Sequence, residues 1–247
     1  MRTALNTARF IFGFFFICVP FTMAACLYLM VATRFGNAAR QTDLWGRGWG
    51  RVFIFCSGAT VTFEGLEGVD RNRSYVCVSN HLSNLDAPYH LCLMPVGVRF
   101  LAKKELYKVP LFGSTLRAVG MVETDRKDHS VAAHQKINEG VARVIDMKRS
   151  LMIYPEGTRS KDGELQDFKK GAFRIAVQNQ MPLLPIAIAG TNNVWPHGHN
   201  VWRGGQTKIV FHPPIETAGL DDSAIEPLRQ QVHRIIGETY QRIRTEV

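Results

Sequence analysis

The feature that constrains this chain most is an uncharged segment near its N-terminus. Residues 10–33 read FIFGFFFICVPFTMAACLYLMVAT and contain no Asp, Glu, Lys or Arg. As a continuous helix this segment would extend about 36 Å, more than the roughly 30 Å of hydrocarbon in a bilayer. Buried helices of soluble proteins rarely stay apolar on every face for this length. The segment also exceeds the ~7–15 apolar residues of a signal peptide, so it predicts attachment to a membrane.

Two features of the segment bear on how it would sit in a bilayer. Arg9 and Arg34 bracket it, and three more arginines with a single aspartate follow before residue 52. An excess of basic residues beside a membrane segment is typical of the cytoplasmic side. Pro20 lies near the middle of the run and predicts a kink or a break. A kinked spanning helix and a broken pair of helices lying partly in one leaflet both remain open.

The composition of the chain excludes several classes of protein. The chain has 247 residues with a net charge of +9, and 46% of its residues are hydrophobic. This is too apolar for a disordered chain, and a mean hydropathy of −0.07 excludes a protein with many membrane spans. The five cysteines lie in the first 92 residues without a Cys-x-x-Cys pair, so they predict a reducing compartment and no disulfide framework. The positive charge fits nucleic acid, an anionic membrane surface or an anionic substrate.

Beyond residue 35 the pattern changes to short apolar strands alternating with amphipathic helices. We therefore expect a membrane-associated segment over residues 1–50 and a catalytic-sized domain over residues 51–247. Strands alternating with helices predict an α/β fold, a mixed sheet flanked by helices. The expected strands cover residues 60–64, 75–79, 98–102, 120–123, 151–154, 183–189 and 208–212. The expected helices cover residues 130–147, 168–178 and 224–245.

A first polar cluster, Ser-Asn-His-Leu-Ser-Asn-Leu-Asp, begins where the expected strand 75–79 ends. His81 lies at the strand exit, where a turn can expose its imidazole. Asp86 is five residues further on and would not share a helical face with His81, and Pro88 biases Ala87 away from helical dihedrals. A turn would still let the carboxylate reach Nδ1, fixing the tautomer and leaving Nε2 as a general base near neutral pH. Such a pair and an ordinary loop histidine, with Asp86 as a helix cap, both remain open.

A second polar cluster, Tyr-Pro-Glu-Gly-Thr-Arg-Ser at 154–160, also follows an apolar strand. Gly157 lets the backbone approach a ligand closely, and Arg159 offers a planar fork for phosphate. Thr158 adds a hydroxyl, and Glu156 has the chemistry to orient the arginine or to accept a hydrogen bond from a substrate hydroxyl. A plain turn with a surface ion pair remains the alternative.

Two further cations lie between these clusters, near the ends of other expected strands. Lys103 follows the strand at 98–102, and Arg126 comes shortly after the strand at 120–123. Folds of the α/β class place their ligands at the carboxyl ends of strands. Taken singly, each cation is better explained as a solvated surface charge.

Taken together, the clusters resemble the sequence blocks of the glycerolipid acyltransferases of the lysophosphatidate type. NHLSNLD is similar to the Asn-His-x4-Asp motif of that family, and YPEGTRS to its Pro-Glu-Gly-Thr-Arg block. AKKELYKVPLFGSTLRAVGMVETDR resembles its second block, although Glu123 and Thr124 stand where apolar residues are usual. FKKGAF and LLPIAIAGT resemble the later blocks, the last of which has a central proline. The blocks follow one another in the expected order over about residues 60–192, and the N-terminal apolar segment fits as well.

This resemblance implies a fold, a reaction and a location. The fold would be glycerol-3-phosphate acyltransferase-like, with an N-terminal membrane-anchoring helical segment. The reaction would move a fatty acyl group from acyl-CoA or acyl-ACP, the acyl carrier protein thioester, to the free hydroxyl of 1-acyl-sn-glycerol 3-phosphate in phospholipid biosynthesis. No bound cofactor, no metal and no nucleic acid are expected, and membrane lipids are the expected partners. The expected location is the cell inner membrane, with the catalytic domain on the cytoplasmic side.

The resemblance also implies a role for each motif residue. His81 would take the proton of the attacking hydroxyl and return it to the leaving thiolate, and Asp86 would orient His81. No acyl-enzyme is needed, because thioester and alcohol can be bound together and react directly. Three cations, Lys103, Arg126 and Arg159, would hold the acceptor phosphate. The remaining motif residues would shape the pocket around it. The expected substrate-binding residues are Lys103, Arg126, Glu156, Gly157, Thr158 and Arg159.

Four other classes of protein fit parts of the sequence less well. A hydrolase with Ser83 or Cys77 as nucleophile lacks a Gly-x-Ser-x-Gly elbow. His197 and His199 have metal-ligand chemistry, but no third ligand lies near them in sequence. A nucleic-acid binder is suggested by charge alone, and a non-catalytic membrane adaptor would have no use for both polar clusters. Among acyltransferases, a lysophospholipid or a lyso-ornithine lipid remains open as the acceptor.

Overall fold

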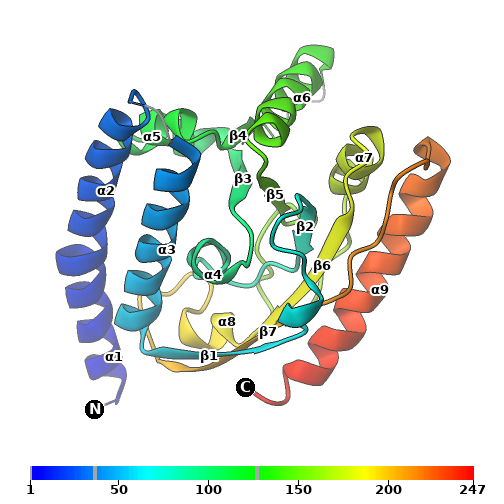
Figure 1. Cartoon of the computed structure of the whole chain (residues 1–247). Coiled ribbons are helices and arrows are strands. Elements are labelled where there is room, and N and C mark those ends of the chain that lie inside the picture. The colour runs from blue at the N-terminus through cyan, green and yellow to red at the C-terminus, as the bar shows by residue number, and fades with distance from the viewer. Residues whose placement is uncertain (1, 36–37, 126–127, 129) are drawn as a thin grey trace.

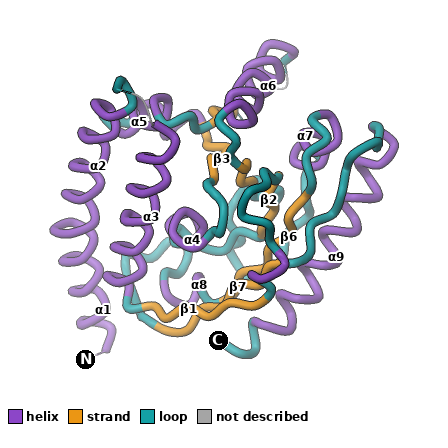
Figure 2. Tube along the Cα trace, viewed as in Figure 1, coloured by secondary structure: helices purple, strands orange, loops and turns teal. Residues whose placement is uncertain are grey.

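The computed structural model describes residues 2–35, 38–125, 128 and 130–247, and within them a single sheet forms the centre of the molecule (Figures 1 and 2). Its strands are β1 Ala59–Glu64, β2 Val76–Ser79, β3 Val98–Lys103, β4 Val122–Thr124, β5 Ser150–Ile153, β6 Leu183–Ala189 and β7 Gly205–Phe211. They lie in the order β1-β7-β6-β2-β5-β3-β4. Neighbouring strands are parallel except β6 and β7, which are antiparallel. The carboxyl ends of β2, β3, β4, β5 and β6 therefore share one edge of the sheet.

Helices cover both faces of this sheet (Figure 1). They are α1 Arg2–Ile11, α2 Val19–Ala32, α3 Ala38–Ser57, α4 Asp86–Leu93, α5 Phe112–Ala118, α6 Val131–Asp146, α7 Gly171–Gln178, α8 Thr191–Val194 and α9 Ile225–Ile243. Residues of α6, α7 and α9 join the apolar cluster on one face. Residues of the N-terminal helix, α3 and α4 join the cluster on the other face.

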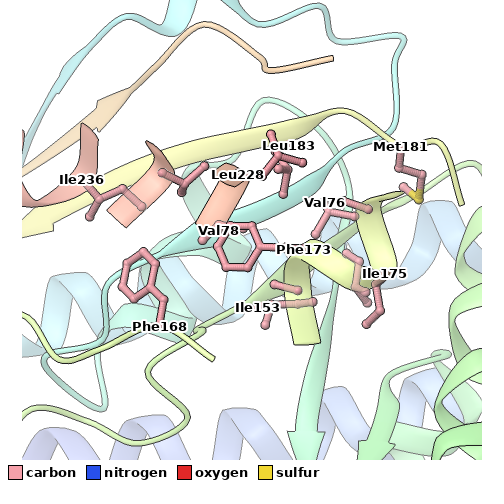
Figure 3. Close-up of a cluster of buried hydrophobic side chains, with 14 of the residues drawn as sticks. Val76, Val78, Ile153, Phe168, Phe173, Ile175, Met181, Leu183, Leu228 and Ile236 are labelled. Carbon is pink, nitrogen blue, oxygen red and sulfur yellow. The ribbon is translucent and has the colours of Figure 1, made fainter. Parts of the chain in front are cut away.

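The side chains of the central strands alternate between these two clusters. In β2, Val76 and Val78 lie on the α7 side of the sheet, whereas Cys77 belongs to the cluster on the α4 side. Figure 3 shows the first cluster, in which Phe173 of α7 and Leu228 of α9 lie close to the strand valines. Because both faces are covered, β2 and β6 are buried along their whole length, as is typical of parallel strands between helices.

The α/β fold class predicted from the sequence is confirmed. Every expected strand has a counterpart within a few residues, and the helices expected at 130–147, 168–178 and 224–245 are α6, α7 and α9. Helix α3 runs through residue 50, so the expected boundary falls inside a helix. The division into a membrane segment and a catalytic domain stays a prediction.

Helix α3 itself is not predicted by the sequence pattern, because its three glycines lower helix propensity. Packing explains one of them: a Cβ atom on Gly50 would lie 2.2 Å from the carbonyl oxygen of Pro88 in α4. Glycine thus allows the two helices to approach closely. Helix α3 is also tied to the sheet by Asp43, which accepts a hydrogen bond of 2.8 Å from Nη1 of the buried Arg99.

The sequence expectation about Pro88 is wrong. Ala87 is helical, and α4 begins at Asp86 with Leu85 as its N-cap. Pro88 is therefore the third residue of the helix, in the first turn, where a backbone N–H would have no intrahelical acceptor. A proline is tolerated there, and the helix start brings Asp86 to the end of the segment that follows β2.

The apolar N-terminal segment forms a continuous helix from Thr3 to Ala32 (Figure 1). Helix α1 passes into α2 through a π-helical segment, Phe12–Cys18. Pro20 lies in the first turn of α2, and the wider turns before it accommodate a residue that has no backbone N–H. The predicted alternative of a break at Pro20 is therefore wrong, and the position of the helix across or partly in one leaflet stays a prediction.

One side of this helix packs against the protein and the other is bare. Phe10 and Cys18 are buried in the cluster on the α4 side of the sheet. Phe12, Phe16 and Leu27 are 62%, 67% and 58% exposed. Among the described residues, this is the one helix long and apolar enough to cross a membrane. A bare apolar face on a helix of this length has the properties of a membrane anchor.

Candidate active site

His81 is placed at the carboxyl edge of the sheet by the residue before it. Asn80 is buried, and its side chain continues the pairing of β2 with β6. Its Nδ2 donates to the carbonyl of Ile188 at 2.9 Å, and its Oδ1 accepts from the N–H of Ile188 at 2.8 Å. These two hydrogen bonds fix the strand exit, so that His81 leaves the sheet between β5 and β6.

Asp86 binds the imidazole of His81 and is itself held by three further donors. Its Oδ2 lies 2.7 Å from Nδ1 of His81 and also accepts from the N–H groups of Leu82 and Ser83 at 2.7 and 2.8 Å. Its Oδ1 accepts from Oγ1 of Thr191, after β6, at 2.6 Å. Burial opposes ionisation of Asp86, but its hydrogen bonds, foremost that from His81, hold its pKa below the usual value. The ionised carboxylate therefore favours the tautomer with the proton on Nδ1.

The pairing of His81 with Asp86 bears on the two interpretations of His81 left open by the sequence. The carboxylate of Asp86 is completely buried, whereas the side chain of His81 is 16% exposed. With Nδ1 engaged by Asp86, Nε2 is the nitrogen left to exchange a proton with a bound molecule. A general base with an orienting carboxylate needs this arrangement, which a free loop histidine would lack. The catalytic role of His81 stays a prediction.

The second polar cluster holds the main chain of His81. Glu156 is buried; its Oε1 accepts from the N–H of His81 at 2.6 Å, and its Oε2 accepts from the N–H of Gln166 at 3.0 Å. The carbonyl of His81 accepts from the N–H of Ser160 at 2.8 Å. Burial raises the pKa of Glu156 to about 7, although the two N–H donors act against this. Both carboxylate oxygens thus accept hydrogen bonds from main-chain N–H groups, and the cluster fixes the main chain that carries His81.

The two described cations of the predicted phosphate site are open to solvent or partly so. Lys103 ends β3 and is exposed, and Arg159 is half-buried. Within the described residues neither has a hydrogen bond or ion pair, whereas the neighbouring Lys104 pairs with Asp125. Thr158 is exposed beside Arg159. Arg126, the third predicted cation, lies outside the described residues.

Gly157 has a backbone conformation that the turn in the second polar cluster requires. Its φ is +76°, in the left-handed region that favours glycine. A Cβ atom there would also lie 2.9 Å from Nζ of Lys169. Any side chain at this position would be strained and would displace the lysine, so the turn requires glycine.

A cavity of about 300 Å³ lies next to this turn, between α6 and α7. Gly157 is the one predicted site residue among its described lining, which also includes Tyr154, Pro155, Lys169 and Arg174. Apolar side chains from β3, β5, α6 and α7 form the rest of its wall together with polar groups. The cavity is large enough to take the polar part of a lipid or the arm of a thioester.

The alternatives to an acyl-transfer site find little support in the geometry. Cys77 is completely buried in β2, and burial raises the pKa of its thiol. Ser83 is buried as well, and its hydroxyl donates to the carbonyl of Trp195 at 2.9 Å. In the described part of the chain, no group of three or more His, Cys, Asp or Glu side chains is placed to hold a metal ion. His197 and His199 are therefore without a third described ligand.

Three residues of the site were not predicted from the sequence. Asn80 directly follows an apolar strand and Thr191 lies two residues after one, positions that favour polar site residues. Tyr154 was expected only as a strand end and part of a block, but its ring lies flat on the imidazole of His81, 4.0 Å between centroids. Strand order brings Tyr154 and Thr191 to His81, and strand order is not visible in the sequence.

The fold and the site together define a class of protein. An exposed imidazole edge that is oriented by a buried carboxylate, with no Ser or Cys hydrogen-bonded to it among the described residues, suits direct transfer of an acyl group to a hydroxyl. Comparison with known proteins agrees: the sequence model of the acyltransferase family matches residues 60–189. The chain belongs to the acyltransferase family, and it is an O-acyltransferase.

Known relatives resemble the chain in sequence, and a solved structure shares its fold. It is 34% identical to the 1-acyl-sn-glycerol-3-phosphate acyltransferase of Cocos nucifera, over 79% of this chain and 63% of the coconut protein. It is 32% identical to the enzyme of the same name from Limnanthes douglasii, over 82% of this chain and 70% of the relative. The crystal structure of the 1-acyl-sn-glycerophosphate acyltransferase PlsC from Thermotoga maritima shares the fold, with a TM-score of 0.83, 24% identity and 98% of both chains covered.

Proposed function

We propose that this enzyme transfers a fatty acyl group from acyl-CoA or acyl-ACP to the free hydroxyl of 1-acyl-sn-glycerol 3-phosphate, giving phosphatidate for phospholipid synthesis. The observation that carries the proposal is the His81–Asp86 pair, at 2.7 Å, on the same sheet edge as Lys103 and Arg159. A proton acceptor on the same sheet edge as cations without a partner among the described residues fits an acceptor that has both a hydroxyl and a phosphate. The names of the two plant relatives support the same acceptor.

The chemistry follows from the orientation of His81. Nε2 accepts the proton of the acceptor hydroxyl while the oxygen attacks the thioester carbonyl, and the C–S bond breaks as the new C–O ester bond forms. The imidazolium then returns the proton to the departing thiolate, so that the base is regenerated. Asp86 stabilises the imidazolium that exists between these two proton transfers. General-base assistance of this kind contributes about 10²–10⁴-fold to the rate.

The remaining site residues are assigned to binding. Lys103 and Arg159, together with Arg126, hold the acceptor phosphate, because charge-assisted bonds to phosphate are short and strong. Thr158 adds a hydroxyl to that pocket, and Glu156 with Gly157 shapes it. Neither a metal ion nor a bound cofactor has a part in this scheme.

The location of the reaction follows from the N-terminal helix. An acyl acceptor of this class resides in a bilayer, and the bare apolar face of the helix supports membrane attachment. We place the enzyme at the cell inner membrane with its catalytic domain on the cytoplasmic side, since arginines follow the apolar run. Acyl-CoA and acyl-ACP are both cytoplasmic thioesters and would reach the site from that side.

A panel of acceptors with a radiolabelled acyl donor tests the proposal. The purified enzyme should acylate 1-acyl-sn-glycerol 3-phosphate in preference to lysophospholipids and a lyso-ornithine lipid, with acyl-CoA and acyl-ACP compared as donors. His81→Ala should lower the rate of transfer by about 10²–10⁴-fold. His199→Ala, at an exposed loop histidine, should leave the rate unchanged. Transfer to a different lyso-lipid would replace the acceptor, and no transfer to any of them would overturn the proposal.

A further inference from the structure

The imidazole of His81 is bounded by an aromatic ring as well as by Asp86. The ring of Tyr154 lies parallel to it, with an interplanar angle of 11° and 4.0 Å between centroids. Tyr154 directly follows β5, the strand next to β2, so the two rings come from neighbouring strand ends. The contact concerns the group that the proposed function makes the base, and the inference below rests on that function.

Tyr154 is in turn held by a buried histidine. Its hydroxyl lies 2.9 Å from Nδ1 of His90, on α4. His90 is 1% exposed, and its Nε2 has no hydrogen-bond partner among the described residues. Burial lowers the pKa of His90 to about 4, so the ring is neutral at physiological pH. The Tyr154 hydroxyl is the one side-chain partner that the described structure gives this histidine.

A buried polar group with one nitrogen unsatisfied costs stability, and an apolar side chain of similar shape would fill the space without that cost. The Tyr154–His90 pair therefore calls for a role besides packing. Helix α4 carries Asp86 in its first turn and His90 one turn later. Helix α4 thus contacts both stacked rings: Asp86 binds Nδ1 of His81, and His90 binds the hydroxyl of Tyr154.

We propose that Tyr154 is a positioning residue for His81, and that His90 fixes Tyr154 through the hydroxyl. A hydrogen bond at Nδ1 alone leaves an imidazole some rotation about its Cβ–Cγ bond, whereas a parallel ring against one face sets its plane. Asp86 then determines which nitrogen faces the substrate, and Tyr154 determines the direction in which Nε2 points. The face of a phenol ring also attracts a cation, which favours the imidazolium formed during transfer.

The experiment is a set of variants assayed for kcat and for KM of both substrates. Tyr154→Leu removes the ring and should lower kcat about 10–100-fold with each KM within about twofold, because misplacement of a reacting group acts on the chemical step. Tyr154→Phe keeps the ring and should restore most of this activity, leaving a loss of about two- to fivefold. His90→Phe should match Tyr154→Phe, and the double variant should lose no more than either one, since both remove the same hydrogen bond.

Tyr75→Phe is the matched control, because Tyr75 is also buried and its hydroxyl donates to the carbonyl of Asp70 at 3.1 Å, on another segment. It should leave kcat unchanged.

Wild-type kcat in Tyr154→Leu, a loss expressed in KM, or an equal loss in Tyr75→Phe would each overturn the inference. Losses that multiply in the double variant would overturn the link to His90. Activity of His81→Ala near the wild-type rate would overturn the proposed function as well, whereas dependence on His81 without dependence on Tyr154 would overturn this inference alone.

Discussion

The reacting centre and the cationic rim of the same site are built in opposite ways. Around His81 the polar groups are paired: Asp86 accepts four hydrogen bonds, and Glu156 accepts one at each oxygen. At the rim, Lys103 and Arg159 have no partner among the described residues. The difference indicates two separate roles. The groups around His81 are positioned before the substrate binds, whereas the cations of the rim gain their partner when the negatively charged substrate binds.

Removing the general base of the reacting centre should have the largest effect on the rate. His81→Ala should lower kcat by about 10²–10⁴-fold, since it removes the proton acceptor and leaves binding groups in place. Asp86→Asn should lose less, because the base remains but its orientation is impaired. Initial rates of labelled acyl transfer, with circular dichroism to confirm the fold, measure both. Turnover of His81→Ala near the wild-type rate would remove this residue from the mechanism.

A change at the rim should act on acceptor binding. Arg159→Ala should raise KM for a phosphate-bearing acceptor by about 10–100-fold, which corresponds to about 1.5–3 kcal/mol for a lost charge-assisted bond. KM for the thioester should change little. The nearby exposed Lys161→Ala provides a control for a general loss of positive charge. An equal loss for both substrates would place Arg159 in the reacting centre instead.

The raised pKa of Glu156, one of the paired groups around His81, can be tested through the pH dependence of stability. Its carboxyl has a usual pKa of 4.5 and, in the folded protein, one of about 7, raised by burial. Between these values the unfolded chain is ionised and the folded chain is not, so the stability contributed by protonated Glu156 is lost as pH rises through this range. The change is on the order of 3 kcal/mol and should be absent in Glu156→Gln.

Thermal unfolding in detergent across pH 4–8 measures this difference. The gap in melting temperature between wild type and Glu156→Gln should shift against the wild type as pH rises. A gap that stays constant would show that burial does not raise the pKa of this carboxyl in the folded protein.

The smallest effect on chemistry is expected at the outer face of the N-terminal helix. Exchanging Phe12, Phe16 and Leu27 for serine should weaken membrane attachment by about 5–9 kcal/mol, because each exposed apolar side chain contributes about 1.5–3 kcal/mol when buried in lipid. On a soluble short-chain acceptor, kcat should stay within about twofold of wild type. Phe10 must be left intact, since it packs with Trp195 and Trp202.

Sedimentation with vesicles in ~1 M salt measures the attachment, because high salt screens the basic flanks. If the triple variant still pellets fully under these conditions, another surface of the protein holds the membrane.

The sequence predicted the parts of this molecule that depend on local pattern. Runs such as Leu183–Ala189 identify strands because they are apolar and bounded by turn residues, and the Asn-His-x4-Asp spacing identifies the His81–Asp86 pair. What it did not predict depends on which strands are neighbours. Thr191 and Tyr154 reach His81 because β6 and β5 lie on either side of β2, although they are separated from it by about 70 to 110 residues.

Local rules also failed where packing outweighed them. The glycines of α3 argue against a helix, yet Gly50 is what lets α3 approach α4. Pro88 argues against a helix at Ala87, yet a first turn tolerates proline. In both cases the residue that misleads a local pattern is explained by its position relative to a helix end or a helix contact.

The most direct measurement of the division between centre and rim is a side-by-side kinetic analysis of Asp86→Asn and Arg159→Ala. Both variants would be assayed with the same labelled thioester over a full range of 1-acyl-sn-glycerol 3-phosphate. Asp86→Asn should lower kcat with little change in acceptor KM, and Arg159→Ala should raise acceptor KM with little change in kcat. If both variants change the same parameter by similar factors, the centre and the rim act as one unit and the division is wrong.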